Sequence, residues 1–420
     1  MLRRRNFSLL VGANLISSTG NMVLYVALPF YVYLLTGSAL ATGTMFVAET
    51  IPPLLLGPLA GVFVDRWDRR RTMIVADTAR AVLLLPLLFV AAADQLWLVY
   101  VVGFGNACLD QFFSPAQGAL LPRLVGPADL AAANSLNASA GQVPLLIGPA
   151  FGGVLLDWLG LPAVVLADSI SFLISALMIA AIVVPPGESA ALPVASTSLR
   201  TRGHAIMNDL LVGLRIIRAN RIVAGLFATV GVLMVSQGIK SVATVPFVTV
   251  MMHGDASVRG LMVTAQGVGG ILGGLVLAQF GRLLTPLQRV IWGPPLVGLL
   301  LLVMVNWPAL IVVLLMMLLI GIGIIAFFPS MRMLLQTAVD DRYRGRVLGA
   351  FGSVIALSNL LGLLLASTCG DLLGPQLMMN LSAALYLLAG AVALCILRRL
   401  PRSATSVVLA SNPGPAPEQH

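Results

Sequence analysis

The chain has 420 residues, of which 59% are hydrophobic and only 10% are charged, and its formal net charge is +9. A soluble domain carries about 25% charged residues because its surface must be solvated, so this composition excludes an ordinary soluble protein. The positive charge does not indicate nucleic-acid binding, because the arginines lie in short clusters between apolar runs, as in the cytoplasmic loops of membrane proteins.

The apolar runs predict helices that cross a bilayer, since one crossing needs roughly 20 residues at about 1.5 Å per residue. In chain order, the first set lies near 10–35, 40–64, 73–93, 97–121, 131–156 and 162–184. The second set lies near 222–250, 258–280, 287–305, 309–335, 346–370 and 376–397. The sequence therefore predicts an all-α integral membrane protein with twelve transmembrane helices.

A polar stretch, residues 185–220, separates the two sets of helices. It begins with Pro185 and Pro186 and ends in a basic segment from His204 to Arg218, in which apolar residues recur at helical spacing. Such a segment is typical of a helix that lies on the membrane surface. We predict a six-helix bundle at 1–184, a cytoplasmic linker with an amphipathic helix at 185–220, a second six-helix bundle at 221–400, and a disordered tail at 401–420.

Charged residues alternate between the predicted loops. One kind of loop holds Arg3 to Arg5, Arg66 with Arg69 to Arg71, Arg123, Arg200 to Arg221, Arg282 with Arg289, Arg342 to Arg346, and Arg398 to Arg402. The other kind holds Asp94, Asp157, Asn306, Asp371 and one lone Arg259. Basic loops stay in the cytoplasm. We therefore expect a multi-pass protein of the cell membrane with both termini in the cytoplasm.

An internal repeat relates the two predicted bundles. The pattern Phe-x-Pro-x4-Leu-Leu-x3-Val at 113–125 recurs at 327–339. At the same offset, Gly148, Asp157 and Gly160 correspond to Gly362, Asp371 and Gly374. Two parallel six-helix repeats are the architecture of rocker-type secondary transporters, in which the substrate site lies between the halves near the membrane midplane. We therefore expect two pseudo-symmetric bundles.

The loop between the second and third predicted helices carries a motif of glycines, one aspartate and arginines. It consists of Gly57, Gly61, Asp65, Arg66, Arg69 and Arg70. Here the chain resembles the major facilitator superfamily, whose cytoplasmic signature has the same order of residues. Asp68 stands where the general signature has glycine, and this variant is similar to the macrolide-efflux and siderophore-exporter branch. The resemblance implies the twelve-helix fold of that family and a cytoplasmic gate at this motif.

A second motif, in the fifth predicted helix, consists of Gly148, Pro149, Gly152 and Gly153. It is similar to a signature of the superfamily's drug–proton antiporters, which is associated with export. Pro144 stands where that signature has its upstream glycine. Ordinary close packing of helices is the alternative explanation, because small residues let two helices approach.

Ionisable residues inside predicted helices are candidate functional groups, since each costs about 3 kcal/mol at mid-membrane and usually faces a cavity. Glu49 and Asp110 are candidates for carrying a coupling proton, because burial penalises the charged form of a carboxyl group. Arg80 could instead hold Asp110 as a structural ion pair. Asp168 and Lys240 are candidate substrate contacts, although Asp168 could face an outer vestibule and Lys240 could be a counter-ion.

Polar side chains recur at helical spacing in the first predicted helix, where they cannot face lipid. Asn14, Asn21 and Tyr25 are therefore expected to line a central cavity or to bind a neighbouring helix, with Asn359 of the eleventh predicted helix as a counterpart. The three cysteines lie in apolar runs, and they predict no disulfide and no metal site. The sequence contains no phosphate-binding loop of the Gly-Lys-Ser/Thr type, so ATP is not expected to drive the protein.

These features predict a proton-coupled exporter that works by alternating access and is not an enzyme. Its expected partners are small amphipathic substrates of the drug or siderophore type, protons and the lipid bilayer. We expect a monomer with no cofactor and no nucleic-acid partner. Two alternatives are a lysophospholipid flippase and a membrane receptor or assembly protein that does not transport.

Overall fold

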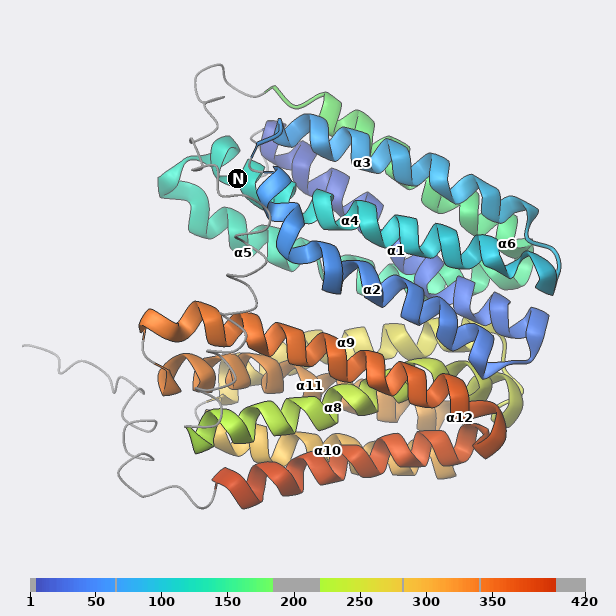
Figure 1. The fold of residues 1–420 in the computed structure, drawn as a ribbon, viewed down its shortest axis with the longest axis vertical. Coiled ribbons are helices and arrows are strands. Elements are labelled where there is room, and N and C mark those ends of the chain that lie inside the picture. The colour runs from blue at the N-terminus through green and yellow to red at the C-terminus, as the bar shows by residue number, and fades with distance from the viewer. Residues whose placement is uncertain (1–4, 65, 184–219, 282, 340, 398–420) are drawn as a thin grey trace, which may run out of the picture.

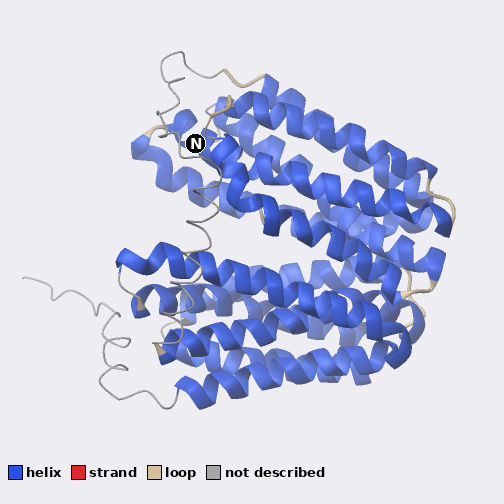
Figure 2. Ribbon diagram, viewed as in Figure 1, coloured by secondary structure: helices blue, strands red, loops and turns tan. Residues whose placement is uncertain are grey.

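The computed structural model describes residues 5–64, 66–183, 220–281, 283–339 and 341–397. Within these residues the protein consists of helices, turns and short loops (Figure 2). The first group is α1 (Arg5–Thr36), α2 (Ala39–Val64), α3 (Arg69–Leu84), α4 (Leu96–Val125), α5 (Leu130–Ala140) and α6 (Val143–Ala180). The second group is α8 (Arg221–Pro246), α9 (Ala256–Phe280), α10 (Pro286–Asn306), α11 (Leu310–Ala338) and α12 (Asp341–Leu397).

Ten helical stretches of the described chain are long and apolar enough to cross a membrane. Two of them, Leu130–Ala180 with 51 residues and Tyr343–Cys395 with 53, are far longer than one crossing requires. Each contains a glycine that leaves the helical conformation, Gly160 with φ 75° and Gly374 with φ 77°. These glycines lie where the sequence predicts loops between helices.

Two predicted helices differ from the observed ones. The helix expected at 73–93 ends at Leu84, and a 3-10 turn that contains Pro86 follows it, because proline cannot donate the next helical hydrogen bond. The helix expected at 131–156 is divided between α5 and α6 at Gly141. A new helix starts there because Pro144 occupies the first turn of α6, a position that proline favours.

The two groups of helices lie side by side with their long axes roughly parallel (Figure 1). They converge at the helix ends that carry Asp94, Asp157, Asp255 and Asp371, which we call the acidic end. They diverge at the opposite end, the basic end, which carries Arg66, Arg123, Arg221, Arg289 and Arg344. The α6–α9 and α2–α12 pairs make most of the contact between the groups.

Large apolar side chains cover the outside of the helices. Trp158, Ile311 and Leu372 are each more than 80% exposed, which a water-soluble surface would not tolerate in such numbers but a lipid environment favours. The predicted tail lies outside the described residues, as does the predicted linker except Asn220. Asn220 caps the start of α8, since its side-chain oxygen accepts hydrogen bonds from the amides of Ile222 and Val223.

Candidate functional site

A polar cavity of about 230 Å³ lies inside the first group of helices, between α1, α2, α3 and α4. We call it the N-terminal cavity. Four of the residues singled out in the sequence line it together, namely Asn21, Tyr25, Glu49 and Asp110. Arg80 and Asn106 complete its polar wall, and Met22, Leu24, Gly103 and Ala107 form its apolar part.

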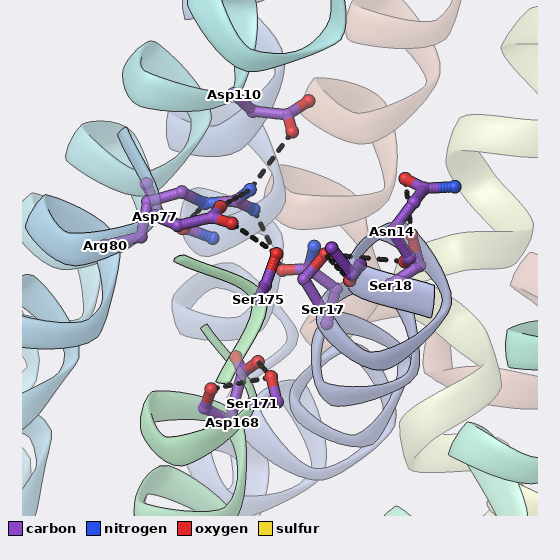
Figure 3. A network of polar contacts seen from close by, with 12 residues as sticks. Asn14, Ser17, Ser18, Asp77, Arg80, Asp110, Asp168, Ser171 and Ser175 are labelled. Atoms are coloured by element: carbon purple, nitrogen blue, oxygen red, sulfur yellow. Dashed lines mark hydrogen bonds and ion pairs between the residues drawn. The ribbon is translucent and has the colours of Figure 1, made fainter. Parts of the chain in front are cut away.

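Arg80 of α3 organises this cavity although it is only 3% exposed. Its Nε donates to Asn106 Oδ1 at 2.8 Å and its Nη2 donates to Asn21 Oδ1 at 3.0 Å. Its Nη1 lies 3.3 Å from Asp110 Oδ1, so the ion pair that the sequence offered as an alternative for Asp110 is present (Figure 3). The planar guanidinium thereby ties α3 to both α1 and α4.

Two further carboxyl groups lie behind Arg80, away from the cavity. Asp77 accepts a hydrogen bond of 2.5 Å from the Ser175 hydroxyl, and its other oxygen is 4.0 Å from Arg80 (Figure 3). Asp168 is fully buried against α1 and accepts from the Ser171 hydroxyl at 3.3 Å. Asp168, a candidate substrate contact from the sequence, therefore lies within the helix bundle and does not line the cavity.

Glu49 of α2 is the second acidic group of the N-terminal cavity. It is half-buried beside Gly103, where an added Cβ would lie 3.4 Å from its Oε1. Across the boundary between the two helix groups, it interacts electrostatically with Arg259 of α9. Glu49 is thus a carboxyl group of this cavity that interacts with the second group of helices.

Arg259 differs from its sequence-based placement in an outer loop, because it lies in the first turn of α9 and is only 3% exposed. Its Nη1 donates to the carbonyl groups of Tyr25 and Val26 in α1. Pro29 explains the first of these bonds: it has no N–H to offer the Tyr25 carbonyl, which is therefore free to accept from Arg259. Arg259 also lies over the Tyr25 ring, 5.8 Å from its centre.

A second, mainly apolar cavity of about 270 Å³ lies in the second group of helices, and we call it the C-terminal cavity. Its polar groups are Gln237, Gln266 and Tyr386, and the Tyr386 hydroxyl donates to Gln237 Oε1 at 3.4 Å. Its remaining lining residues are Leu233, Met234, Gly293, Pro294, Val297, Gly323, Ile324, Phe327 and Phe328. The two cavities thus differ in chemistry, one charged and one apolar.

The remaining cavity candidates do not line either cavity. Lys240 is 6% exposed in α8 and forms no ion pair within the described part of the chain. Asn359 lies in α12 with its backbone packed against Gly238 of α8. The side-chain oxygen of Asn14 accepts a long hydrogen bond of 3.5 Å from Ser18, one turn further along α1 (Figure 3).

The glycines of the antiporter-like motif lie at close helix contacts of α6. A Cβ at Gly148 would lie 2.4 Å from Met22 Cβ, and one at Gly152 would lie 2.4 Å from the Val23 carbonyl, both in α1. Gly153 faces the other way, with a built Cβ 2.4 Å from the Ala256 carbonyl of α9. The motif therefore lets α6 pack tightly on its own group and on the second group at once.

Two aspartates join the helix groups at the acidic end, and we call them the aspartate clamps. Asp371 accepts hydrogen bonds from the Ala39 amide at 2.6 Å, the Leu40 amide at 3.3 Å and the Ser38 hydroxyl at 2.7 Å, at the start of α2. Asp157 accepts from the amides of Ala256 at 3.1 Å and Ser257 at 2.8 Å, at the start of α9. Each carboxylate thus caps a helix N-terminus across the boundary, where a negative charge is favoured.

Two arginines of the cytoplasmic motif bind backbone carbonyl groups of other helices in the first group. Arg69 donates to the Ala119 carbonyl at 3.2 Å, and Arg70 donates to the carbonyls of Ile179 and Ala180 at the end of α6. Arg66 is exposed in the turn after α2, and Gly57 lies in α2 itself. Gly61 continues α2, whereas Asp65, the acidic member of the motif, lies outside the described residues.

Sequence reasoning missed the roles of Arg259 and of the aspartate clamps. The repeat had already paired Asp157 with Asp371, and the single arginine among acidic loops was the available signal for Arg259. The sequence does not show which neighbouring helix each of these side chains contacts.

The protein-family model for the Major Facilitator Superfamily matches residues 10–362 of this chain. The multidrug efflux pump Tap of Mycolicibacterium fortuitum is 28% identical over 94% of this chain and 97% of its own length. Macrolide efflux protein A of Streptococcus pyogenes is 24% identical over 91% of each chain.

Solved structures agree on the fold. A bacterial homologue of the iron transporter ferroportin, in an inward-facing state, superposes with a TM-score of 0.76 at 16% identity and covers 95% of this chain and 100% of its own. A bacterial homologue of the human lysosomal transporter Spinster, also inward-facing, gives a TM-score of 0.72 at 13% identity and covers 98% of both chains. With a family match that spans most of the chain and transporters of the same fold, this multi-pass membrane protein belongs to the Major Facilitator Superfamily.

Proposed function

We propose that this protein is a proton-coupled exporter of amphipathic small molecules that works by alternating access between its two groups of helices. The observation that carries the proposal is the arrangement of the groups, which are clamped together at the acidic end and diverge at the basic end. A transporter of this kind exposes its central cavity to one side of the membrane at a time.

The proposal includes twelve membrane crossings in two pseudo-symmetric bundles. Gly160 and Gly374 each divide a helical stretch of more than 50 residues, and each divided stretch is long enough for two crossings. The basic end then faces the cytoplasm with both termini, as the positive-inside rule requires. In this orientation the structure is an inward-open state, with the aspartate clamps closing the outer side.

The chemistry of the two cavities supports an amphipathic substrate. The N-terminal cavity offers carboxyl and amide groups to the polar part of a molecule, and the C-terminal cavity offers a mainly apolar lining. The names of two relatives, a multidrug efflux pump and a macrolide efflux protein, support export as the direction.

Glu49 is the preferred carrier of the coupling proton. Asp110 is 47% exposed and already paired with Arg80, whereas Glu49 has only the more distant charge of Arg259 beside it. An ionised Glu49 would attract Arg259, and Arg259 holds the Tyr25 and Val26 carbonyls across the closed outer side. Because Glu49, Tyr25 and Val26 all belong to the first helix group, attraction between ionised Glu49 and Arg259 also holds the two groups together. Protonation of Glu49 would remove this attraction, so proton binding and opening of the outer side would favour each other.

Everted membrane vesicles test the proposal directly. Ethidium should accumulate inside vesicles that contain the protein when the interior is acidic, and accumulation should stop when an ionophore collapses the proton gradient. Vesicles without the protein are the control. Accumulation that ignores the gradient would contradict proton coupling, and absence of accumulation for every dye of an amphipathic panel would contradict export.

A further inference from the structure

A groove of about 430 Å³ lies on the outer face of the second helix group, with walls from α9 and α10 and a floor from α11. Its side chains face the surroundings of the protein, since Phe280, Leu284, Trp292 and Leu296 are 52%, 51%, 58% and 51% exposed. The groove is almost entirely apolar, and its polar members, Gln288 and Arg289, lie in the first turn of α10 at the basic end.

The groove and the C-terminal cavity share two lining residues, and both are glycines. Gly293 lies in α10 and Gly323 lies opposite in α11, and we call them the glycine seam. A Cβ at Gly323 would lie 3.3 Å from Val297 Cγ2, and one at Gly293 would lie 3.9 Å from Phe327 Cδ2. The two helices thus touch at Gly323, where a Cβ would crowd Val297, and a Cβ at Gly293 would be in ordinary contact with Phe327. The wall between the two spaces is therefore thin at these glycines, because neither residue adds a side chain to it.

From this geometry we propose that the glycine seam is a lateral entrance, through which amphipathic molecules dissolved in the lipid leaflet at the basic end reach the C-terminal cavity. This inference rests on the proposed export function and adds the route by which substrate arrives. An apolar body fits the groove between α9 and α10, and a polar head remains level with Gln288 and Arg289, at the depth of the lipid head groups.

The rim of the groove is held in place. Arg289 donates through Nη2 to the carbonyls of Gly281 and Leu284 and through Nη1 to the Ser330 hydroxyl at 3.5 Å. Thr285 caps α10 by accepting from the Gln288 amide at 3.2 Å, and the Gln288 side chain accepts in return from the Thr285 amide at 2.8 Å. The polar end of the groove is therefore fixed by hydrogen bonds, whereas the seam itself is held by helix packing.

Photolabelling of the full chain in liposomes tests the route without requiring transport. A long-chain amine that carries a diazirine is dissolved in the bilayer and activated by light, and the labelled residues are mapped by mass spectrometry. In the wild-type protein we expect labels in the groove, on Trp292 and Leu296, and in the cavity, on Met234 and Phe327.

Gly323→Leu and Gly293→Leu should keep the groove labels and reduce the cavity labels about tenfold, because a leucine side chain would fill the seam and raise the free energy of passage by about 1.4 kcal/mol or more. Gly274→Leu is the matched control, since this α9 glycine has open space beside it and does not line the groove. Cavity labels that persist in both seam variants, or a groove that stays unlabelled in the wild type, would overturn the inference.

Transport measurements separate this inference from the proposed function. Extrusion of the lipid-dissolved dye TMA-DPH should fall relative to that of water-borne ethidium, with the ratio of the two rates decreasing about tenfold in the seam variants. If both extrusion rates fall by the same factor, the seam acts only as part of the cavity wall. That result would overturn the lateral route. If the wild type extrudes neither dye but the photolabels behave as expected, the export function fails and the entrance remains as a binding path.

Discussion

At the scale of single residues, the N-terminal cavity depends on one arginine with several acceptors. Arg80 binds Asn21, Asn106 and Asp110 from two other helices, and two more carboxyl groups lie behind it. A lysine at this position would keep the charge but could not reproduce the planar set of donors. The geometry of the cavity therefore follows from the guanidinium group and not from the charge alone.

Arg80→Ala should destabilise the protein by roughly 3 kcal/mol, because hydrogen bonds from a charged donor contribute about 1.5–3 kcal/mol each and the half-exposed pair with Asp110 adds little. Arg80→Lys should recover part of this loss. Thermal unfolding in detergent, followed by size-exclusion chromatography, measures both. Arg71→Ala is the control, since Arg71 is exposed at the basic end; equal stability of Arg80→Ala and this control would refute the assigned role.

Glu49→Gln should abolish uphill export while substrate binding and counterflow remain, because the substitution removes the titrating group and keeps the shape of the side chain. Everted vesicles give the uphill rate, and exchange of preloaded dye gives the counterflow rate. Asp94→Asn, at the exposed acidic end, serves as the control. If Glu49→Gln still pumps uphill and Asp110→Asn does not, the coupling role passes to Asp110.

At the scale of helices, two glycines divide the two longest helical stretches. Gly160 has ψ −179° and Gly374 has ψ 163°, both with positive φ, a combination that other residues adopt only under strain. Pro162 and Pro375 follow them closely and prevent the helix from continuing in register. The reversal of the chain at the acidic end is therefore encoded locally, in the same way in both helix groups.

Gly160→Ala and Gly374→Ala should each cost about 1–3 kcal/mol of stability, since alanine must enter this strained conformation. Gly345→Ala is a matched control within α12, where a Cβ meets open space, and it should be neutral or stabilising by up to about 1 kcal/mol. Melting temperatures in detergent decide the matter. A melting temperature for Gly160→Ala that matches the control would show that the turn tolerates ordinary residues.

At the scale of the whole molecule, the contact between the helix groups is concentrated where the aspartate clamps lie. Asp371 and Asp157 come from corresponding positions of the sequence repeat, and they cap α2 and α9 respectively. Arg259 adds a third connection, to α1. In the proposed transport cycle, opening of the acidic end would release all three, so each contributes to the energy difference between the two proposed states.

Asp157→Ala and Asp371→Ala should each shift the population toward the outward-open state by roughly two- to fivefold, since a charge at an exposed helix N-terminus contributes about 0.3–1 kcal/mol. The two effects should add, because the clamps share no partner. Double electron–electron resonance between spin labels on the two groups measures the populations. Asp255→Ala is the control, as this α9 N-cap side chain makes no capping bond; an identical shift in the control would contradict the clamps.

Asp65→Asn should shift the same equilibrium in the opposite direction, toward the inward-open state. The expected reason is loss of a carboxylate that meets the start of α12 near Arg344 when the basic end closes. The same spin-label pairs report the change, which allows a direct comparison with the clamp variants. Unchanged distance distributions in Asp65→Asn would contradict a role of Asp65 in closing the basic end.

What the sequence determined by itself depends on windows of neighbouring residues. Apolar runs of crossing length, the alternation of basic and acidic loops, and the cytoplasmic motif are all local, and they predicted helical spans, a membrane setting and the family. Asn21, Tyr25, Glu49 and Asp110 were also found from sequence, because polar groups inside an apolar helix are conspicuous and rarely face lipid.

Only the tertiary structure decided which of those groups share a site. Lipid is as apolar as the interior of a helix bundle, so hydropathy does not tell which face of a membrane helix is buried. For that reason Asp168, a candidate for a substrate contact or an outer vestibule, lies behind the cavity, and Arg259, expected in a loop, is buried against α1. The partners of Arg80, the aspartate clamps and the glycine seam join helices distant in sequence, and their contacts arise from packing alone.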